Sequence, residues 1–117
     1  MKILRVNIIT ILFSKIWFPA DQSNKVAKRY IEWLKDNPPD KTIETNVRIG
    51  VLSDENGNIL AISMADIMRG KEKEALYNVN KQNVFMAAGI EGFKYKCEII
   101  LDFNEAYKIL NMTAPEV

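Results

Sequence analysis

The chain has 117 residues, of which 48% are hydrophobic, and 16 Lys and Arg stand against 15 Asp and Glu. This length fits a single domain, residues 1–117, whose core needs no disulfide or metal to fold. A net charge of +1 provides no long-range field for a phosphate backbone or an anionic membrane, so neither partner is expected.

Histidine is absent, which removes the commonest general base, the commonest haem ligand and zinc sites built from His and Cys. No catalytic signature or nucleotide-binding loop is present either. We therefore expect no cofactor and no metal, and we assign no catalytic residue. The single cysteine, Cys97, has no partner for an intramolecular disulfide and favours a reducing cytoplasm.

The first segment, Ile3 to Ile16, is rich in Ile, Val, Thr and Phe, with apolar residues on both alternation phases. This pattern predicts a long strand that is covered on both faces. Arg5 and Lys15 are among the polar residues that interrupt the apolar run, which makes it too polar to span a membrane and a poor signal peptide. Secretion is the alternative.

A helix is predicted next, with Asp21 as its N-cap, because Val26, Tyr30 and Trp33 recur at helical spacing. Pro38 and the proline after it end this helix. The clearest strand pattern follows, with one apolar and β-branched face made of Ile43, Thr45, Val47, Ile49 and Val51. The turn at Asn56-Gly57 supplies positive φ angles, and Ile59 to Met68 forms the returning strand of a hairpin.

The second half repeats the helix–strand order. Gly70 breaks the chain, Lys71 to Ala88 is predicted to be helical, and Gly89 takes the position of a left-handed cap. A last strand runs from Phe93 to Leu101. Asp102 and Glu105 match a capping box before a short C-terminal helix, which contains Ala106, Tyr107, Ile109 and Leu110.

This order predicts an α+β fold, a ferredoxin-like βαββαβ arrangement with a four-stranded antiparallel sheet and a short C-terminal helix. Its two longer helices cover only one face of the sheet. The other face mixes large apolar groups with a few charges, which a monomer rarely leaves exposed. We therefore expect a homodimer that stacks sheet on sheet as a dimeric α/β barrel.

Four short stretches carry a resemblance to a known group of proteins: Trp17-Phe18-Pro19, Asn37-Pro38-Pro39, Gly70-Lys71 and Ile90-Glu91-Gly92-Phe93. Together they resemble uncharacterised small archaeal proteins of the dimeric α/β-barrel superfamily. That superfamily includes monooxygenases, haem-degrading enzymes, isomerases, stress-responsive proteins and ligand-sensing domains. Fold alone does not choose among these activities, and the absent histidine argues against the haem-binding branch.

Four residues are candidates for ligand binding, and two of them are expected inside the cavity between two stacked sheets. Arg48 and Asp66 form a candidate polar pair, in which a carboxylate in an apolar setting acquires a raised pKa suited to proton transfer. A structural salt bridge is the alternative. Trp17 and Tyr95 are candidates to line a pocket for an apolar ligand, or else belong to the core or interface. Cys97 is predicted to be a buried, inert thiol.

Three functions remain open from the sequence. The first is a dimeric protein, stress-associated or ligand-binding, whose cavity holds a small hydrophobic molecule. The second is a structural or interaction domain without a ligand. The third is a cofactor-free monooxygenase or isomerase that uses Asp66 or Tyr95 as proton acceptor.

Overall fold

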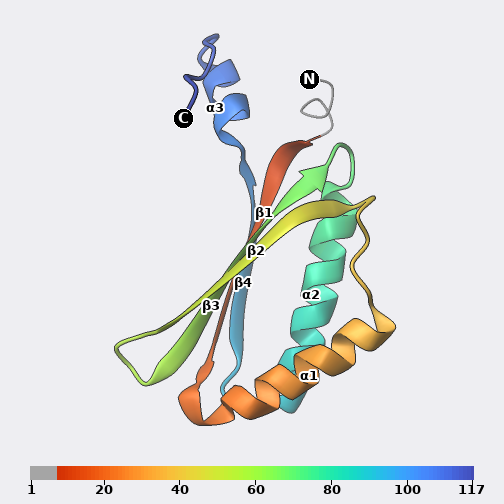
Figure 1. The fold of residues 1–117 in the computed structure, drawn as a ribbon, viewed down its shortest axis with the longest axis vertical. Coiled ribbons are helices and arrows are strands. Elements are labelled where there is room, and N and C mark those ends of the chain that lie inside the picture. The colour runs from red at the N-terminus through yellow and green to blue at the C-terminus, as the bar shows by residue number, and fades with distance from the viewer. Residues whose placement is uncertain (1–7) are drawn as a thin grey trace.

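The computed structural model describes residues 8–117. It contains four strands and three α-helices in the order β1 (Ile8–Pro19), η2 (a 3-10 turn, Ala20–Gln22), α1 (Ser23–Asp36), β2 (Glu44–Ser53), β3 (Asn58–Met68), α2 (Glu72–Gly89), β4 (Lys94–Leu101) and α3 (Phe103–Ile109). The strands form one antiparallel sheet in the order β2-β3-β1-β4 (Figure 1). The predicted ferredoxin-like fold is confirmed. The predicted first strand began at Ile3, and Ile3 to Asn7 lie outside the described residues.

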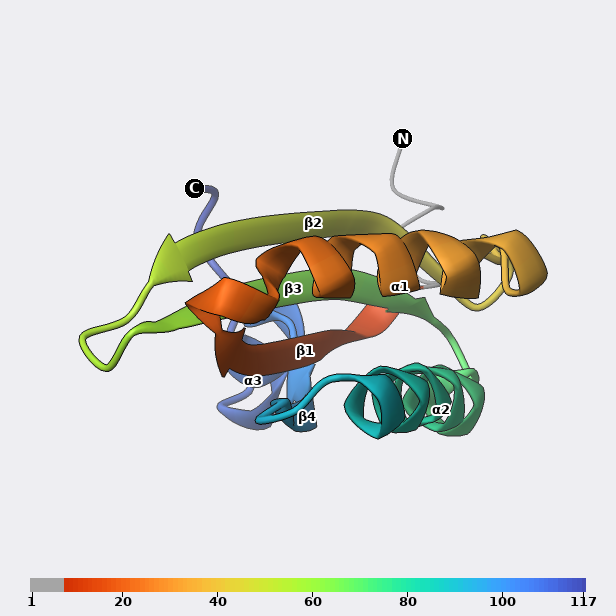
Figure 2. The ribbon, with the colours of Figure 1, turned by 90° about the horizontal axis from the view of Figure 1, so that it is seen from below.

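The two long helices lie on the same side of the sheet, and α3 projects past its end (Figure 1). Seen from below, α1 and α2 are separate rods, with α1 in front of the sheet (Figure 2). The chain is extended for its length. Its radius of gyration is 16.1 Å, against about 13 Å for a compact domain of this size.

The core forms where α2 and the start of α1 meet the two central strands. One buried cluster joins Phe18, Val26 and Met86 with Ile90 and Phe93. A second cluster joins Leu12, Ala65, Ile67 and Ala75. Both draw on alternate residues of β1 and β3, as expected of strands with one face against the helices. These residues define the helix-facing side of the sheet.

The β2–β3 hairpin is confirmed, with one difference in its turn. The Asp54 carboxylate accepts the backbone amides of Asn56 at 2.8 Å and Asn58 at 2.9 Å. Gly57 has a φ of 79°, which glycine adopts without steric cost. Asn56 does not share the positive φ, so only one of the two expected residues takes that conformation.

The predicted faces of β2 are wrong at its start, because the strand contains a bulge. Asn46 has a φ of 53°, and the register with β3 shifts between Thr45 and Arg48. Such a bulge places an extra residue in one strand and reverses the side-chain alternation before it. Glu44 therefore pairs with the buried Ile67 on the helix-facing side, and Thr45 pairs with Asp66 on the opposite side.

Two predicted helix ends differ from the structure. Asp21 lies inside η2 and does not cap α1, whose N-cap residue Gln22 makes no side-chain capping bond. Gly89 is the last residue of α2, and its φ is not positive. A Cβ at this position would overlap the Arg29 guanidinium. The glycine is explained by close approach of α1, not by a left-handed cap.

The C-terminal helix has the predicted cap. The Asp102 carboxylate accepts the Glu105 amide at 2.8 Å, which satisfies a free amide of the first turn. The Glu105 carboxylate does not complete the expected capping box; it pairs with the Lys108 ammonium at 2.9 Å. None of the residues of α3 is buried, so this helix stands clear of the core.

Candidate functional site

A groove of about 740 Å³ opens between α1, α2 and the helix-facing side of the sheet. Its walls carry Val26, Tyr30 and Trp33 from α1 and Val79, Asn83 and Met86 from α2. This volume lies in the range of pockets that hold small organic molecules.

The floor of the groove contains three apolar side chains of β2 that no helix covers. Val47, Ile49 and Val51 lie on the helix-facing side, yet they are 52%, 55% and 65% exposed. On the neighbouring β3, by contrast, Ala65 and Ile67 of the same side are buried under α2 and its cluster. An apolar strip is thus left exposed on the helix-facing side of the sheet, where the core would be expected to cover it.

The groove is open because α1 is fixed to α2 and stands away from β2. Arg29 donates two hydrogen bonds to the Phe85 carbonyl, from Nε at 2.9 Å and from Nη2 at 2.6 Å. Its guanidinium also lies 3.9 Å from the centroid of the Phe85 ring, and the Trp33 ring packs 5.4 Å from the same ring. Charge-assisted bonds and cation–π contacts are among the stronger side-chain interactions. They hold the α1 wall in place.

A polar cluster at the inner wall is internally satisfied. The Asn83 amide donates to the Cys97 sulfur at 3.2 Å, and the Ser14 hydroxyl donates to it at 3.5 Å. Asn83 and Ser14 are buried, and Cys97 is half-buried. The cysteine therefore acts as a hydrogen-bond acceptor within the core, a role that the prediction of an inert buried thiol did not include.

Glu44 and Tyr30 are two polar residues of the groove lining that interact with one another. Within residues 8–117, the Glu44 carboxylate makes no hydrogen bond and no ion pair, and its burial raises its pKa above the ordinary value. The pKa of the Tyr30 hydroxyl is also raised, first by burial and then by the negative charge of Glu44. A poorly hydrated carboxylate and a phenol thus interact on the groove wall.

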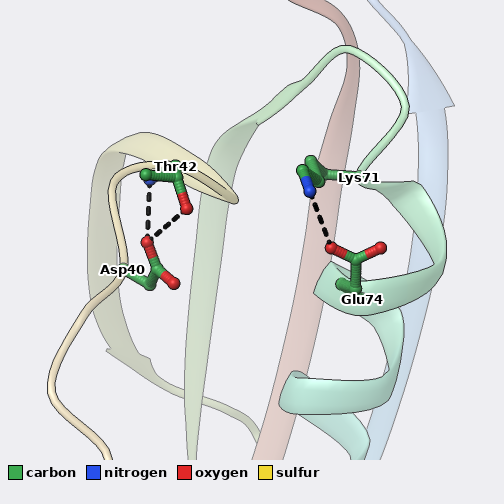
Figure 3. Close-up of polar contacts among 4 residues, drawn as sticks. All are labelled: Asp40, Thr42, Lys71 and Glu74. Carbon is green, nitrogen blue, oxygen red and sulfur yellow. Dashed lines mark hydrogen bonds and ion pairs between the residues drawn. The ribbon is translucent and has the colours of Figure 1, made fainter.

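The loop that leads from α1 into β2 closes one end of the groove. Asp40 on this loop accepts the Thr42 amide at 2.9 Å and the Thr42 hydroxyl at 2.6 Å, and these bonds lower its pKa (Figure 3). At the start of α2, Lys71 pairs with Glu74 at 3.2 Å (Figure 3). The lysine charge is therefore already partnered beside this end of the groove.

The four ligand-binding candidates from the sequence do not line this groove. Trp17, Arg48 and Asp66 lie on the opposite, helix-free face of the sheet. No ion pair joins Arg48 to Asp66 in the part of the chain that the structure describes. The Asp66 carboxylate instead accepts a hydrogen bond from the Asn46 side-chain amide at 2.9 Å. Tyr95 is on the helix-facing side of β4, with its ring 6.3 Å from that of Phe93.

The helix-free face has the mixed character expected from the sequence. Its charges include Lys15, Arg48, Asp66 and Glu98, with the Lys96–Glu98 pair 3.7 Å apart. Its apolar side chains, identified by strand register, are Ile11, Phe13, Trp17, Leu52, Leu60, Ile62, Met64 and Ile100. We call this surface the open face.

Within residues 8–117 no group of His, Cys, Asp and Glu side chains has the arrangement of a metal site. Over the same residues, no helix is both long and apolar enough to cross a membrane.

No family model matches the sequence, and no curated protein matches it either. Among solved structures, a dimeric ferredoxin-like protein from an uncultured marine organism matches with a TM-score of 0.53 and 12% identity, over 82% of this chain and 96% of that one. The C-terminal domain of the MgtC protein from Mycobacterium tuberculosis matches with a TM-score of 0.42 and 10% identity, over 77% and 88%. The first likeness agrees with the strand order and helix placement of this chain, which has the ferredoxin-like fold.

Proposed function

We propose that the chain is a homodimeric protein that binds a small, largely apolar molecule. The observation that carries this proposal is the groove of about 740 Å³ with three exposed apolar side chains on its floor, Val47, Ile49 and Val51. Leaving such a strip in water forgoes about 25 cal/mol for each Å² of apolar surface. A bound apolar molecule recovers that free energy.

The homodimer rests on a separate observation, the open face. Eight apolar side chains share it with charges of both signs, and a second copy would cover them. The solved structure of similar fold is described as a dimeric ferredoxin-like protein, which supports a dimer. A dimeric α/β barrel in a reducing cytoplasm is the full form of the proposal.

Sedimentation velocity tests the dimer. We expect a particle near twice the 13.4 kDa chain mass. Met64→Glu places a charge in the middle of the open face, opposite Phe13 and Arg48, and should yield monomers. Val84→Glu is the matched control, since Val84 is 57% exposed on α2. A monomeric native chain, or dissociation caused equally by both substitutions, would contradict this part.

The two tryptophans test where a ligand binds, because Trp33 lines the groove and Trp17 lies on the open face. Trp17→Phe and Trp33→Phe each leave one reporter. Titration with the neutral dye N-phenylnaphthylamine should quench Trp33 by energy transfer more strongly than Trp17. Stronger quenching of Trp17 would place the ligand between the sheets, and no quenching of either would refute ligand binding.

A second candidate function, an interaction domain without a ligand, is favoured by the C-terminal segment. Phe103 and Ile109 of α3 and its C-cap residue Leu110 are 48%, 69% and 64% exposed, and no residue of α3 is buried. Exposed apolar side chains grouped on one short element are typical of a contact surface. An interaction domain without a ligand is favoured if the dye quenches neither tryptophan while sedimentation shows a dimer.

A further inference from the structure

The start of β2 is folded so that an acidic side chain enters the groove. Without the bulge at Asn46, strict alternation from Arg48 would place Glu44 on the open face. The bulge reverses the preceding side chains, and Glu44 faces the helices instead. A left-handed residue in mid-strand is thus what brings the carboxylate to the groove.

Within residues 8–117, Glu44 is in none of the ion pairs, although charged residues lie near it. Lys71 is 3.2 Å from Glu74, and Asp40 adds a second negative charge on the adjoining loop. Among the described residues, Lys81 is the one Lys or Arg that lines the groove, and it is exposed on α2 with its ammonium 5.7 Å from the Tyr77 ring. Glu44 is half-buried and makes no described ion pair, and its raised pKa reflects that lost hydration.

The polar and apolar parts of the groove are separated in a way that suits one kind of molecule. Glu44 and the Tyr30 hydroxyl interact electrostatically, and both line the groove together with the strip of Val47, Ile49 and Val51. Asn83 and Ser14 already donate hydrogen bonds to Cys97. These two side chains are therefore not available to bind the polar head group of a ligand. A carboxylate that is partly removed from water gains most from an ionised donor.

We propose that the groove binds an organic cation, with a protonated amine against Glu44 and Tyr30 and an apolar body over Val47, Ile49 and Val51. This inference rests on the proposed function, because it assigns a ligand class to the same groove. The selectivity comes from charge and not from shape: an alcohol of the same length fills the same space but leaves the Glu44 charge uncompensated.

The test uses three probes that differ only in the head group: phenylbutylamine, phenylbutanol and phenylbutyrate. Binding is followed at neutral pH by the fluorescence of Trp33 in the full-length Trp17→Phe protein. We expect the amine to bind at least about tenfold more tightly than the alcohol, which corresponds to about 1.4 kcal/mol, and the carboxylate to bind most weakly. Glu44→Gln should remove the preference for the amine while leaving the alcohol unchanged.

Two further variants keep the test decisive. Glu98→Gln removes a carboxylate from the open face and should leave the preference intact. Tyr30→Phe should reduce the preference without abolishing it, since the carboxylate remains. Equal affinity for amine and alcohol, or a preference that survives Glu44→Gln, would overturn the ligand class while leaving the groove as a binding site. If none of the three probes alters Trp33 fluorescence, the proposed function fails as well.

Discussion

The contrast between two isoleucines on the same side of the sheet gives the sharpest stability test of the groove. Ile67 of β3 is fully buried, whereas Ile49 of β2 is 55% exposed. Truncation of a fully buried Ile to Ala costs about 2–5 kcal/mol, because the lost transfer free energy is joined by a cavity. We therefore expect Ile67→Ala to lower the free energy of unfolding by an amount in that range.

Ile49→Ala should cost much less. Complete burial of an Ile side chain is worth about 1.5–3 kcal/mol, and with 55% of the residue exposed the loss should be about 1 kcal/mol. No closed cavity is created, because the side chain already borders the open groove.

Urea denaturation of both variants, at one protein concentration so that dimerisation contributes equally, measures the difference. Ile67→Ala should be less stable than Ile49→Ala by at least about 1 kcal/mol. If the two variants lose the same free energy, α1 covers β2 in solution, and the groove described above does not exist.

Three further predictions concern charge and helix packing. Asp54→Ala should lower the free energy of unfolding at neutral pH, because the folded protein holds the pKa of Asp54 below its ordinary 3.8. This loss of stability should vanish as the pH falls through that folded pKa. Glu44→Gln should raise the free energy of unfolding at neutral pH, because burial holds the folded pKa of Glu44 above its ordinary 4.5. This gain in stability should disappear below pH 4.5. Urea midpoints measured against pH check both, and a Glu44→Gln protein that is less stable at neutral pH would contradict the second. Gly89→Ala in the native chain should displace Arg29 and should therefore add little or nothing to the free energy of unfolding. In an Arg29→Ala background the same substitution should add up to about 1 kcal/mol, because alanine favours the helix more than glycine does. An equal effect in both backgrounds would show that Arg29 does not contact Gly89.

Most of the fold was predictable because its signals are local. Alternation along β2 and β3, the Asn56-Gly57 turn and the Asp102 cap each act over a few residues, and each element formed near its expected position. The prolines after α1 also ended that helix as expected, since proline cannot continue the hydrogen-bond pattern.

The groove was not predictable, because it depends on contacts between distant segments. The position of α1 is set by Arg29 against Phe85, 56 residues apart. Nothing in a helical pattern indicates that a helix will pack on its neighbour and not on the sheet. The sequence therefore predicted Trp17, Arg48 and Asp66, which lie on the open face, as ligand-binding residues. It did not predict Glu44 and Tyr30, which line the groove.

One signal for Glu44 was present in the sequence. Asn46 interrupts a run of β-branched residues, and asparagine is among the few non-glycine residues that adopt positive φ readily. An asparagine within a strand is therefore a candidate bulge, and a bulge exchanges the faces of the strand residues that precede it. With that inference, Glu44 would have been placed toward the helices and Thr45 away from them.

The neighbouring residues Val51 and Leu52 test the whole account in one experiment, because they point to opposite sides of β2. Val51 is 65% exposed in the groove and Leu52 is 48% exposed on the open face. Val51→Cys and Leu52→Cys are each labelled with a bulky maleimide at concentrations where the chain is dimeric, with the native protein as the blank for Cys97. We predict that Val51→Cys reacts rapidly and is slowed by phenylbutylamine, while Leu52→Cys is protected by the second copy until the dimer is diluted. Rapid labelling of Leu52→Cys in the dimer together with protection of Val51→Cys without ligand would contradict it.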